Sequence, residues 1–227
     1  MTETGMTEAA MTEATGALLA LWNDIDPAFE PAYEDWHANE HVPERLTVPG
    51  FLWARRYAAL AAGSGPRYLT LYGLRSCEVL ESAAYRRLLA EPTPASALMR
   101  PRLRNISRWV CEVKCLRGSW EADPLFVQTT EEPDAASIAG TGAQEREMKN
   151  GTVESQRTME SGTDCLLARR LLDAAPLPWM NDNQAQAVRG RWLLAWTGQS
   201  ANARPSDAAQ RYTRLPVAGS WPPPANR

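Results

Sequence analysis

The chain has 227 residues, of which 44% are apolar and nine are tryptophan, enough for a packed core in one large domain or in two of about 100 residues each. Its 24 basic and 27 acidic residues give a formal charge of −3 without a long basic run, so nucleic acid is not an expected partner. No window approaches the roughly 20 apolar residues that cross a membrane, and we expect a cytoplasmic protein with no membrane partner.

Residues 1–16 are polar and acidic and contain Met-Thr-Glu three times. They lack the basic start and the apolar centre of a signal peptide, so we expect a disordered leader. At the other end, three consecutive prolines follow Trp221, and such a segment cannot continue a central strand. Residues 218–227 are therefore expected to form a flexible tail.

An apolar run at residues 17–22 predicts a buried strand, and the polar segment 23–27 after it predicts the start of a helix. Aromatic rings recur along that helix at i, i+4 and i+7, namely Phe29, Tyr33 and Trp36. The helix is expected to continue to about Glu44, where Pro43 and then Pro49-Gly50 stop it and turn the chain into the next strand.

The following segment completes a βαββαβ unit. Strands are predicted at residues 51–57 and 67–73, joined by the glycine-rich turn 63–66. A second helix starts at Ser76 and ends near residue 91, and a fourth strand is expected at residues 107–116. This order folds as a four-stranded antiparallel sheet with both helices on one face, so the other face needs a partner.

The same order recurs in weaker form after a linker at residues 118–124. The expected elements are strands at 125–129, 164–173 and 191–197, a poor helix at 134–150 and a short helix at 206–212. Leu-Leu-Ala-Arg-Arg at 166–170 also resembles Leu-Trp-Ala-Arg-Arg at 52–56. We predict an α+β fold of two tandem units, at 17–117 and 124–217, the second degenerate, whose sheets bury their open faces against each other within one chain.

The only two histidines, His37 and His41, lie four apart at the end of the first predicted helix. Histidine is the side chain best suited to proton transfer near neutral pH. His41 lies on or near the buried helix face and is the candidate general acid or base, with Glu40 or Asp24 orienting it. It could instead be a structural residue whose charge suits the helix dipole. His37 is the weaker candidate, expected to be partly exposed or structural.

The segment from His37 to His41 also fits the H-x-x-E-H pattern of a zinc-binding helix. That motif needs a helix that continues past it and a third ligand, yet Pro43 follows within two residues and no other histidine exists. We therefore predict no metal, while a site of two histidines and one carboxylate stays open as an alternative.

The four cysteines, at positions 77, 111, 115 and 165, lack zinc or redox spacing. Cys111 and Cys115 are expected on one strand, where residues four apart are separated by about 13 Å, too far for a disulfide. Buried thiols are the expected state.

Strand alternation suggests which residues line a cavity. If Leu69 and Leu71 face the helices, the barrel interior receives Tyr68, Thr70 and Tyr72, together with Trp22 and Asp24 of the first strand. A tyrosine hydroxyl and a histidine in an aromatic pocket suit proton transfer next to a carbonyl group, although each ring could equally be ordinary core. Arg55 and Arg56 could hold a substrate carboxylate or pair with surface acids.

The passage from Trp36 to Leu46, followed by the segment from Val48 to Tyr57, resembles the EthD-like family of the dimeric α+β barrel superfamily. The resemblance covers roughly residues 16–117. It implies a ferredoxin-like sheet that pairs with a second sheet into a barrel with a ligand cavity. It also places His41, followed by Pro43, at the position of a histidine-proline motif at the end of the family's first helix.

The superfamily includes isomerases, cyclases, cofactor-free monooxygenases, haem-degrading oxygenases and proteins without known activity, so the fold alone does not name the reaction. The expectation is a small-molecule enzyme that uses histidine acid–base chemistry in a barrel cavity, as an isomerase, cyclase, lyase or cofactor-free oxygenase. Trp22, Tyr68, Tyr72, Arg55 and His37 are the expected substrate-binding residues. The alternative is a non-catalytic barrel that binds a small ligand or haem. Homo-oligomerisation stays open.

Overall fold

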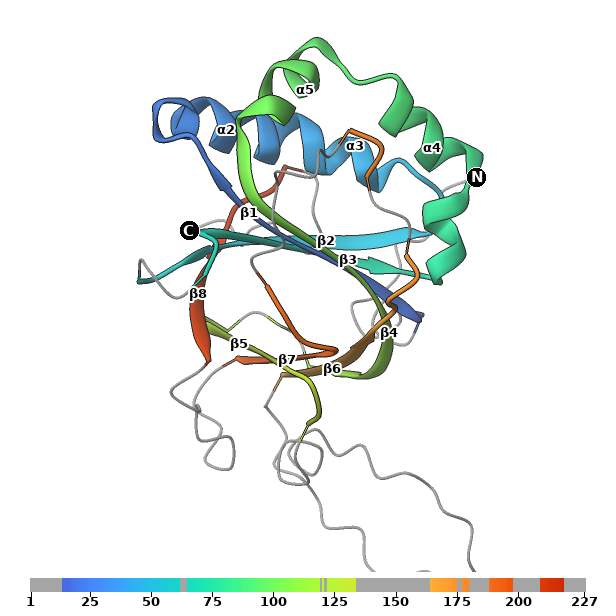
Figure 1. Cartoon of the computed structure of the whole chain (residues 1–227). Helices are drawn as coiled ribbons and strands as arrows, with labels where there is room; N and C mark the ends of the chain where they lie inside the picture. The colour runs from blue at the N-terminus through green and yellow to red at the C-terminus, as the bar shows by residue number, and fades with distance from the viewer. Residues whose placement is uncertain are drawn as a thin grey trace, which may run out of the picture.

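The computed structural model describes residues 14–61, 65–118, 120, 122–133, 164–174, 177–179, 188–197 and 209–218. Their strands form one closed antiparallel barrel in the order β1-β3-β2-β8-β5-β7-β6-β4 (Figure 1). The strands are β1 (Ala17–Ile25), β2 (Phe51–Ala59), β3 (Tyr68–Leu74), β4 (Leu103–Arg117), β5 (Leu125–Thr130), β6 (Cys165–Arg170), β7 (Trp192–Thr197) and β8 (Gln210–Leu215).

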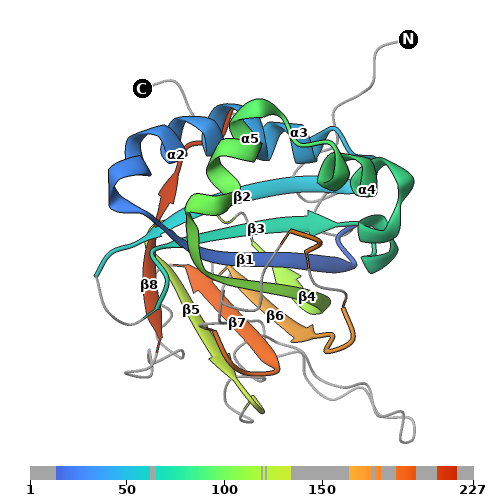
Figure 2. The same ribbon diagram turned by 45° about the horizontal axis from the view of Figure 1, so that its top comes forward.

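The described helices lie over the outer face of β1, β2 and β3 (Figure 2). The first helical segment consists of a 3₁₀ turn (Pro27–Phe29), α2 (Glu30–Trp36), a π-helical turn (His37–His41) and α3 (Val42–Leu46). The second consists of a 3₁₀ turn (Cys77–Glu81), α4 (Ala83–Ala90), α5 (Pro94–Met99) and a 3₁₀ turn (Arg100–Arg102). The single second helix predicted from Ser76 is thus divided, because Ser82 is extended and caps α4 by accepting from the Tyr85 amide.

The two halves of the chain follow the same strand order. The first half is arranged β4-β1-β3-β2 and the second β8-β5-β7-β6, and the pairs β2–β8 and β4–β6 join them. The predicted α+β barrel is therefore built from strands of one chain. The prediction of a helix at 206–212 is wrong for the part of that range that the structure describes. Residues 210–215 form β8, in which Tyr212 is buried between more exposed neighbours. The helix predicted at 134–150 lies outside the described residues.

Large side chains from both halves meet inside the barrel. Trp22 of β1 and Trp109 of β4 pack edge to face with their ring centroids 5.3 Å apart. Leu69 and Leu71 of β3 belong to the same core. Second-half strands contribute Leu125, Val127, Leu166, Ala168, Leu193, Ala195 and Tyr212. The barrel is therefore one shared hydrophobic core.

The predicted facing of β3 is wrong. Tyr72 packs with Val42 and Tyr85 on the helix-covered face, and Tyr68 packs beside Tyr33 of α2. Thr70 shares that face, while Leu69 and Leu71 point into the barrel. Every residue of β3 is buried, so both of its faces are core, and the alternation of aromatic and aliphatic residues did not reveal which face the helices cover.

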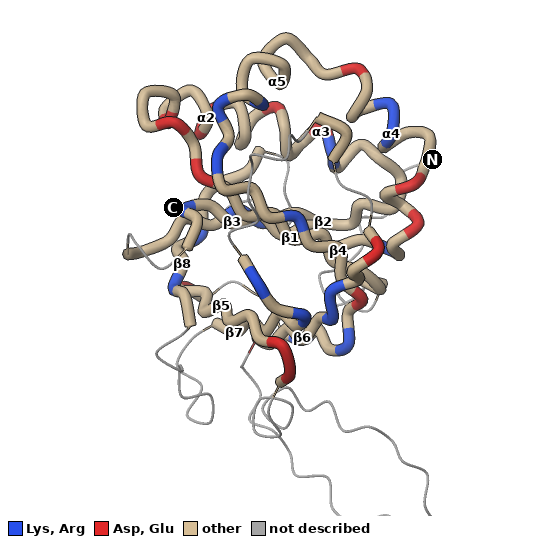
Figure 3. Tube along the Cα trace, viewed as in Figure 1, with Lys and Arg blue, Asp and Glu red and all other residues tan. Residues whose placement is uncertain are grey.

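Charged residues of both signs are interspersed along the described helices and strands (Figure 3). No helix of the described part of the chain is long and apolar enough to span a membrane. The four cysteines form no disulfide, as predicted, and Cys111 and Cys115 lie on the same strand, β4. The sequence did not reveal that the sulfur of Cys115 lies 3.7 Å from that of Cys165 on the neighbouring strand β6.

Candidate functional site

The first helical segment was predicted to continue to about Glu44, and it runs two residues further, through Pro43 to Leu46. A proline ring would collide with the carbonyl four residues earlier in a regular α-helix, and it has no amide hydrogen to donate. Here the helix widens just before Pro43 into the π-helical turn, in which the Val42 amide donates to the His37 carbonyl five residues back. The chain then continues into α3, which ends at Leu46 with Thr47 as its C-cap.

The widened turn keeps a stripe of functional side chains on one face of the segment. Tyr33, His37, His41 and Arg45 are spaced four residues apart, and all four line one cavity. The ring centroids of His37 and His41 are 5.1 Å apart with nearly parallel planes, and the Tyr33 ring stacks on His37 from the other side at 5.0 Å. The histidines are thus a packed pair.

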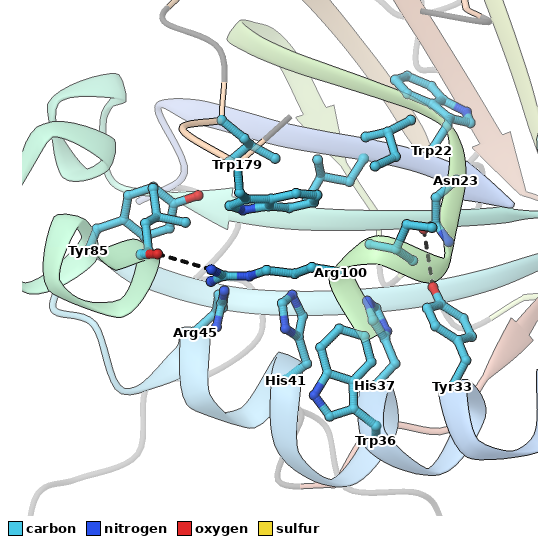
Figure 4. A pocket seen from close by; sticks show the side chains of 15 residues that line it. Trp22, Asn23, Tyr33, Trp36, His37, His41, Arg45, Tyr85, Arg100 and Trp179 are labelled. Atoms are coloured by element: carbon cyan, nitrogen blue, oxygen red, sulfur yellow. Dashed lines mark hydrogen bonds between the residues drawn. The ribbon is translucent and has the colours of Figure 1, made fainter. Parts of the chain in front are cut away.

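The cavity lies between the helices and the outer face of the first-half strands, and has a volume of about 50 Å³ (Figure 4). The expectation of a cavity inside the barrel is wrong for this site, because core side chains occupy the barrel interior. The lining comes from β1, both helical segments, β4 and residues 177–179: Leu21, Trp22, Asn23, Tyr33, Trp36, His37, His41, Arg45, Tyr85, Leu89, Arg100, Leu103, Ile106, Leu177 and Trp179.

Both histidines are neutral at physiological pH. Burial lowers the pKa of His37 well below 6.5, and the charges of Arg56 and Arg45 lower it further. Burial is also the main cause that lowers the pKa of His41. Its neighbours Arg45, His37, Arg100 and Arg56 lower it further, in that order. His37 is buried rather than partly exposed. The Nδ1 atom of each ring is buried without a hydrogen-bond partner among the described residues. Two neutral imidazoles are therefore available to a ligand.

Two guanidinium groups complete the polar part of the cavity. Arg45 of α3 forms an ion pair with Glu44. Arg100, in the turn after α5, donates to the carbonyls of Leu89 at 3.1 Å and Leu88 at 3.4 Å. The Trp179 ring lies over the Arg100 guanidinium, 5.4 Å from its centroid. No acidic residue is among the described residues that line the cavity.

The two carboxylates predicted to orient His41 are engaged elsewhere. Glu40 accepts a hydrogen bond from the Thr93 hydroxyl, at the start of α5. Asp24 accepts from the Arg67 amide and from the Asn105 side chain, each at 2.6 Å. Neither lines the cavity. The structure therefore brings His37 and His41 together, with Trp22 at the edge of the cavity and its ring packed in the barrel core, and separates Glu40 and Asp24 from them.

The remaining predicted binding residues also lie outside the cavity. The Tyr68 hydroxyl donates to Glu30 at 2.9 Å, and the Tyr72 hydroxyl is buried on the helix-covered face. Arg55 lies on the same face of β2 as Trp53 and Tyr57, which pack in the barrel core, and its guanidinium lies over the Trp53 ring. Arg56 faces the helices and forms an ion pair with Glu34 at 2.8 Å.

Several cavity residues were not predicted from the sequence. Arg45 could have been found, because it continues the four-residue spacing of Tyr33, His37 and His41. Arg100 and Trp179 carried no such signal, since they reach the cavity only through the tertiary fold. Within the described ranges, no group of three or more His, Cys, Asp and Glu side chains is placed to hold a metal ion. The carboxylate of the H-x-x-E-H pattern, Glu40, is bonded to Thr93 instead.

No family model matches the chain, and none of the curated proteins matches it in sequence. A crystal structure described as that of an anthrone oxidase-like protein has a similar fold, with a TM-score of 0.50. The match covers 92% of this chain and 96% of that chain at 13% sequence identity. At this identity the likeness shows the fold alone. It supports the barrel architecture, while membership of the EthD-like family stays a prediction.

Proposed function

We propose that this chain is a small-molecule enzyme in which His41 accepts a proton from a weakly acidic ligand bound in the helix-side cavity. The observation that carries the proposal is the pair of neutral imidazoles, each with an unpartnered ring nitrogen, in a cavity that also contains two guanidinium groups. His41 is assigned as the base because Arg45 and Arg100 both act on it electrostatically, and so lie close enough to stabilise the anion that remains when the ligand loses its proton. His37, stacked between Tyr33 and His41, positions it.

The chemistry follows from the charges. A carbon acid next to a carbonyl group, or a phenol, becomes an anion when it loses a proton, and a fixed cation beside that anion lowers the barrier. The same cations disfavour a charged imidazole, so the base stays neutral at neutral pH, and its lowered pKa makes the transfer depend on stabilisation of the anion. Isomerisation, cyclisation, elimination and cofactor-free oxygenation can each begin with this step. The structural neighbour's description as anthrone oxidase-like is one reason to include oxygenation.

The size of the cavity sets a condition on the ligand. A volume of about 50 Å³ corresponds to roughly four water molecules, whereas ligand pockets commonly measure about 300–1,000 Å³. A ligand with more than about four non-hydrogen atoms, a single aromatic ring included, must therefore displace part of the wall. Leu177 and Trp179 are the lining residues furthest in sequence from the rest of the site. They form the part of the wall that neither the helical segments nor β1 and β4 provide.

We also infer that the two halves are ferredoxin-like repeats, with the domain limits 17–117 and 124–217 expected from the sequence. The support is the shared strand order, in which the first strand of each half lies between its third and fourth strands. The second half contains no histidine. We therefore assign the chemistry to the first repeat and a structural role to the second.

The test begins with mass spectrometry of ligands that co-purify with the protein. Exchange of the ligand's acidic hydrogen for solvent deuterium is then followed by NMR for wild type, His41→Gln and His37→Gln. His41→Gln should slow exchange by about 10²-fold or more, because proton transfer typically supplies that much. His37→Gln is the matched control and should slow it less. Equal exchange rates in wild type and His41→Gln would refute the assignment of His41 as base.

A second candidate is a non-catalytic binding barrel, including one that binds haem. It is favoured by the same neutral imidazoles, because a histidine must be neutral to ligate a metal. Haem added to the purified protein should then give a Soret band that His41→Ala abolishes. If no band forms, the haem alternative is rejected.

A further inference from the structure

We propose that the helix-side cavity recognises a small organic carboxylate, whose charged end is held by Arg100 together with Arg45. The proposal deepens the proposed function, on whose cavity it rests, by naming the class of ligand. It concerns binding and not proton transfer, so the two can fail separately.

Arg100 is a buried cation without a carboxylate partner in the described part of the chain. The residue is 9% exposed, and among the residues that the structure describes, no acidic side chain lies within ion-pair distance of its guanidinium. Its hydrogen bonds go to two backbone carbonyls near the end of α4, and its Nε is buried without a partner. The carbonyls satisfy some of the N–H donors of Arg100, and the negative end of the α4 dipole partly stabilises its positive charge. Neither neutralises that charge.

Arg45 adds a second cation to the same wall. Its side chain is 6% exposed and its described ion-pair partner is Glu44, which does not line the cavity. The positive charge of Arg45 adds to burial in lowering the pKa of Arg100, as expected for like charges held close together. Of the two guanidinium charges, one is balanced by Glu44 and one is left over. A ligand with one negative charge would neutralise the site.

The shape and surroundings of the cationic end favour an organic carboxylate. A guanidinium offers a planar fork of N–H groups that matches the two oxygens of a carboxylate. Figure 4 shows the Arg100 guanidinium between Arg45 and Trp179, with His41 beside it. The Trp179 indole N–H is also buried without a partner, so it is a further donor. The remaining wall is mostly aromatic or aliphatic, including Leu21, Trp36 and Leu177, which suits an apolar body attached to the carboxylate.

Benzoate and benzamide provide a matched pair of probes, since they have nearly the same size and differ in charge. Calorimetric titration at low ionic strength should show benzoate binding wild type at least tenfold more tightly than benzamide. Arg100→Met should abolish that preference. Arg87→Met, which removes an exposed arginine of α4, should retain it. Binding of benzoate and benzamide with equal affinity to wild type would overturn the proposal.

Replacement variants and a comparison with inorganic phosphate complete the test. If Arg100→Met does not fold, Arg100→Lys and Arg45→Met are titrated in its place, and a benzoate preference that survives both refutes the assignment. Equal stabilisation of wild type by inorganic phosphate and benzoate would show a general anion site and overturn the organic part of the proposal. Carboxylate recognition is read from the preference for benzoate over benzamide, and proton transfer from hydrogen exchange in the His41→Gln variant, so a failure of one and a failure of the other are distinguishable.

Discussion

The two halves of the barrel share an inner core but differ on their outer faces. Outside β1–β4, helices cover the strands and enclose the cavity that contains both histidines, Arg45 and Arg100. On the outer face of β5–β8, the described residues form an apolar cluster that includes Leu167, Leu194 and Trp196. The barrel core is therefore a scaffold common to both halves, and the candidate chemistry is confined to the layer between the helices and one set of strands.

The largest expected effect concerns the part that the halves share. Trp109→Ala removes a fully buried ring from the core between them and should destabilise the protein by about 3–5 kcal/mol. Hydrogen exchange followed by mass spectrometry should show peptides of β1 and β7 losing protection together, in one transition. Leu98→Ala, at a side chain that is 54% exposed, is the control and should change stability by about 0.5 kcal/mol or less. If the two halves lost protection in separate transitions, the conclusion that they share one core would be contradicted.

The next effect is a pH dependence that belongs to the first half alone, since both histidines lie there. Burial and neighbouring arginines lower the pKa of each histidine in the folded protein, so below pH 6.5 the unfolded chain binds protons that the folded chain does not. Their contribution to stability is complete above pH 6.5 and is lost as the pH falls toward the lowered pKa values. Between pH 6.5 and 5.5 the loss should be about 2 kcal/mol for the pair.

Urea unfolding of wild type and of the double variant His37→Gln/His41→Gln, across this pH range, measures the effect. The carboxyl groups titrate in both proteins, so their contribution cancels in the difference. The double variant should lack the additional acid sensitivity. The same slope in both proteins would mean that the histidines become protonated in the folded state, contrary to the neutral pair.

A smaller effect on stability distinguishes two arginines, one from each of the repeated Ala-Arg-Arg segments. The Arg56 side chain is 2% exposed and pairs with Glu34, whereas Arg169 is 51% exposed and pairs with Glu112. Glu34→Gln leaves a buried cation poorly compensated and should cost about 1–2 kcal/mol, reduced because Glu34 is itself partly exposed. Glu112→Gln should cost about 0.5 kcal/mol or less. Denaturant unfolding of both variants provides the comparison, and equal losses would contradict it.

These arginines also show why the sequence repeat was only a partial guide. Ala54 of β2 packs on the helix-covered face, whereas the matched Ala168 of β6 packs inside the barrel. A register irregularity in β2 follows Phe51, and a shift of one residue exchanges the two faces of a strand. The similar segments are therefore not equivalent in three dimensions. The strand order, which no short motif reports, is the better evidence for two related halves.

The sequence predicted the first half well where the chemistry is local. The apolar run of β1, the aromatic stripe of α2 and the turn at Gly50 each follow from nearby residues. The histidines were found because they are rare and share one helix face. Arg100 and Trp179 were not, because the path of the chain brings them to His41 from 59 and 138 residues away in sequence. Long-range packing leaves no periodic signal to read.

The smallest predicted effect tests whether the helical layer is anchored independently of the barrel. Ser82 caps α4, and Thr93 caps α5 while also donating to Glu40 in the π-helical turn of the first helical segment. Ser82→Ala should cost about 0.5–1 kcal/mol, and Thr93→Ala somewhat more, because it removes a cap and a tie between helices. In native-state hydrogen exchange, Thr93→Ala should speed exchange in α5 and leave β5–β8 unchanged. Faster exchange throughout both halves would show that the helices and the barrel open as one unit. Loss of the cap would then raise exchange rates beyond the helical layer that contains the cavity.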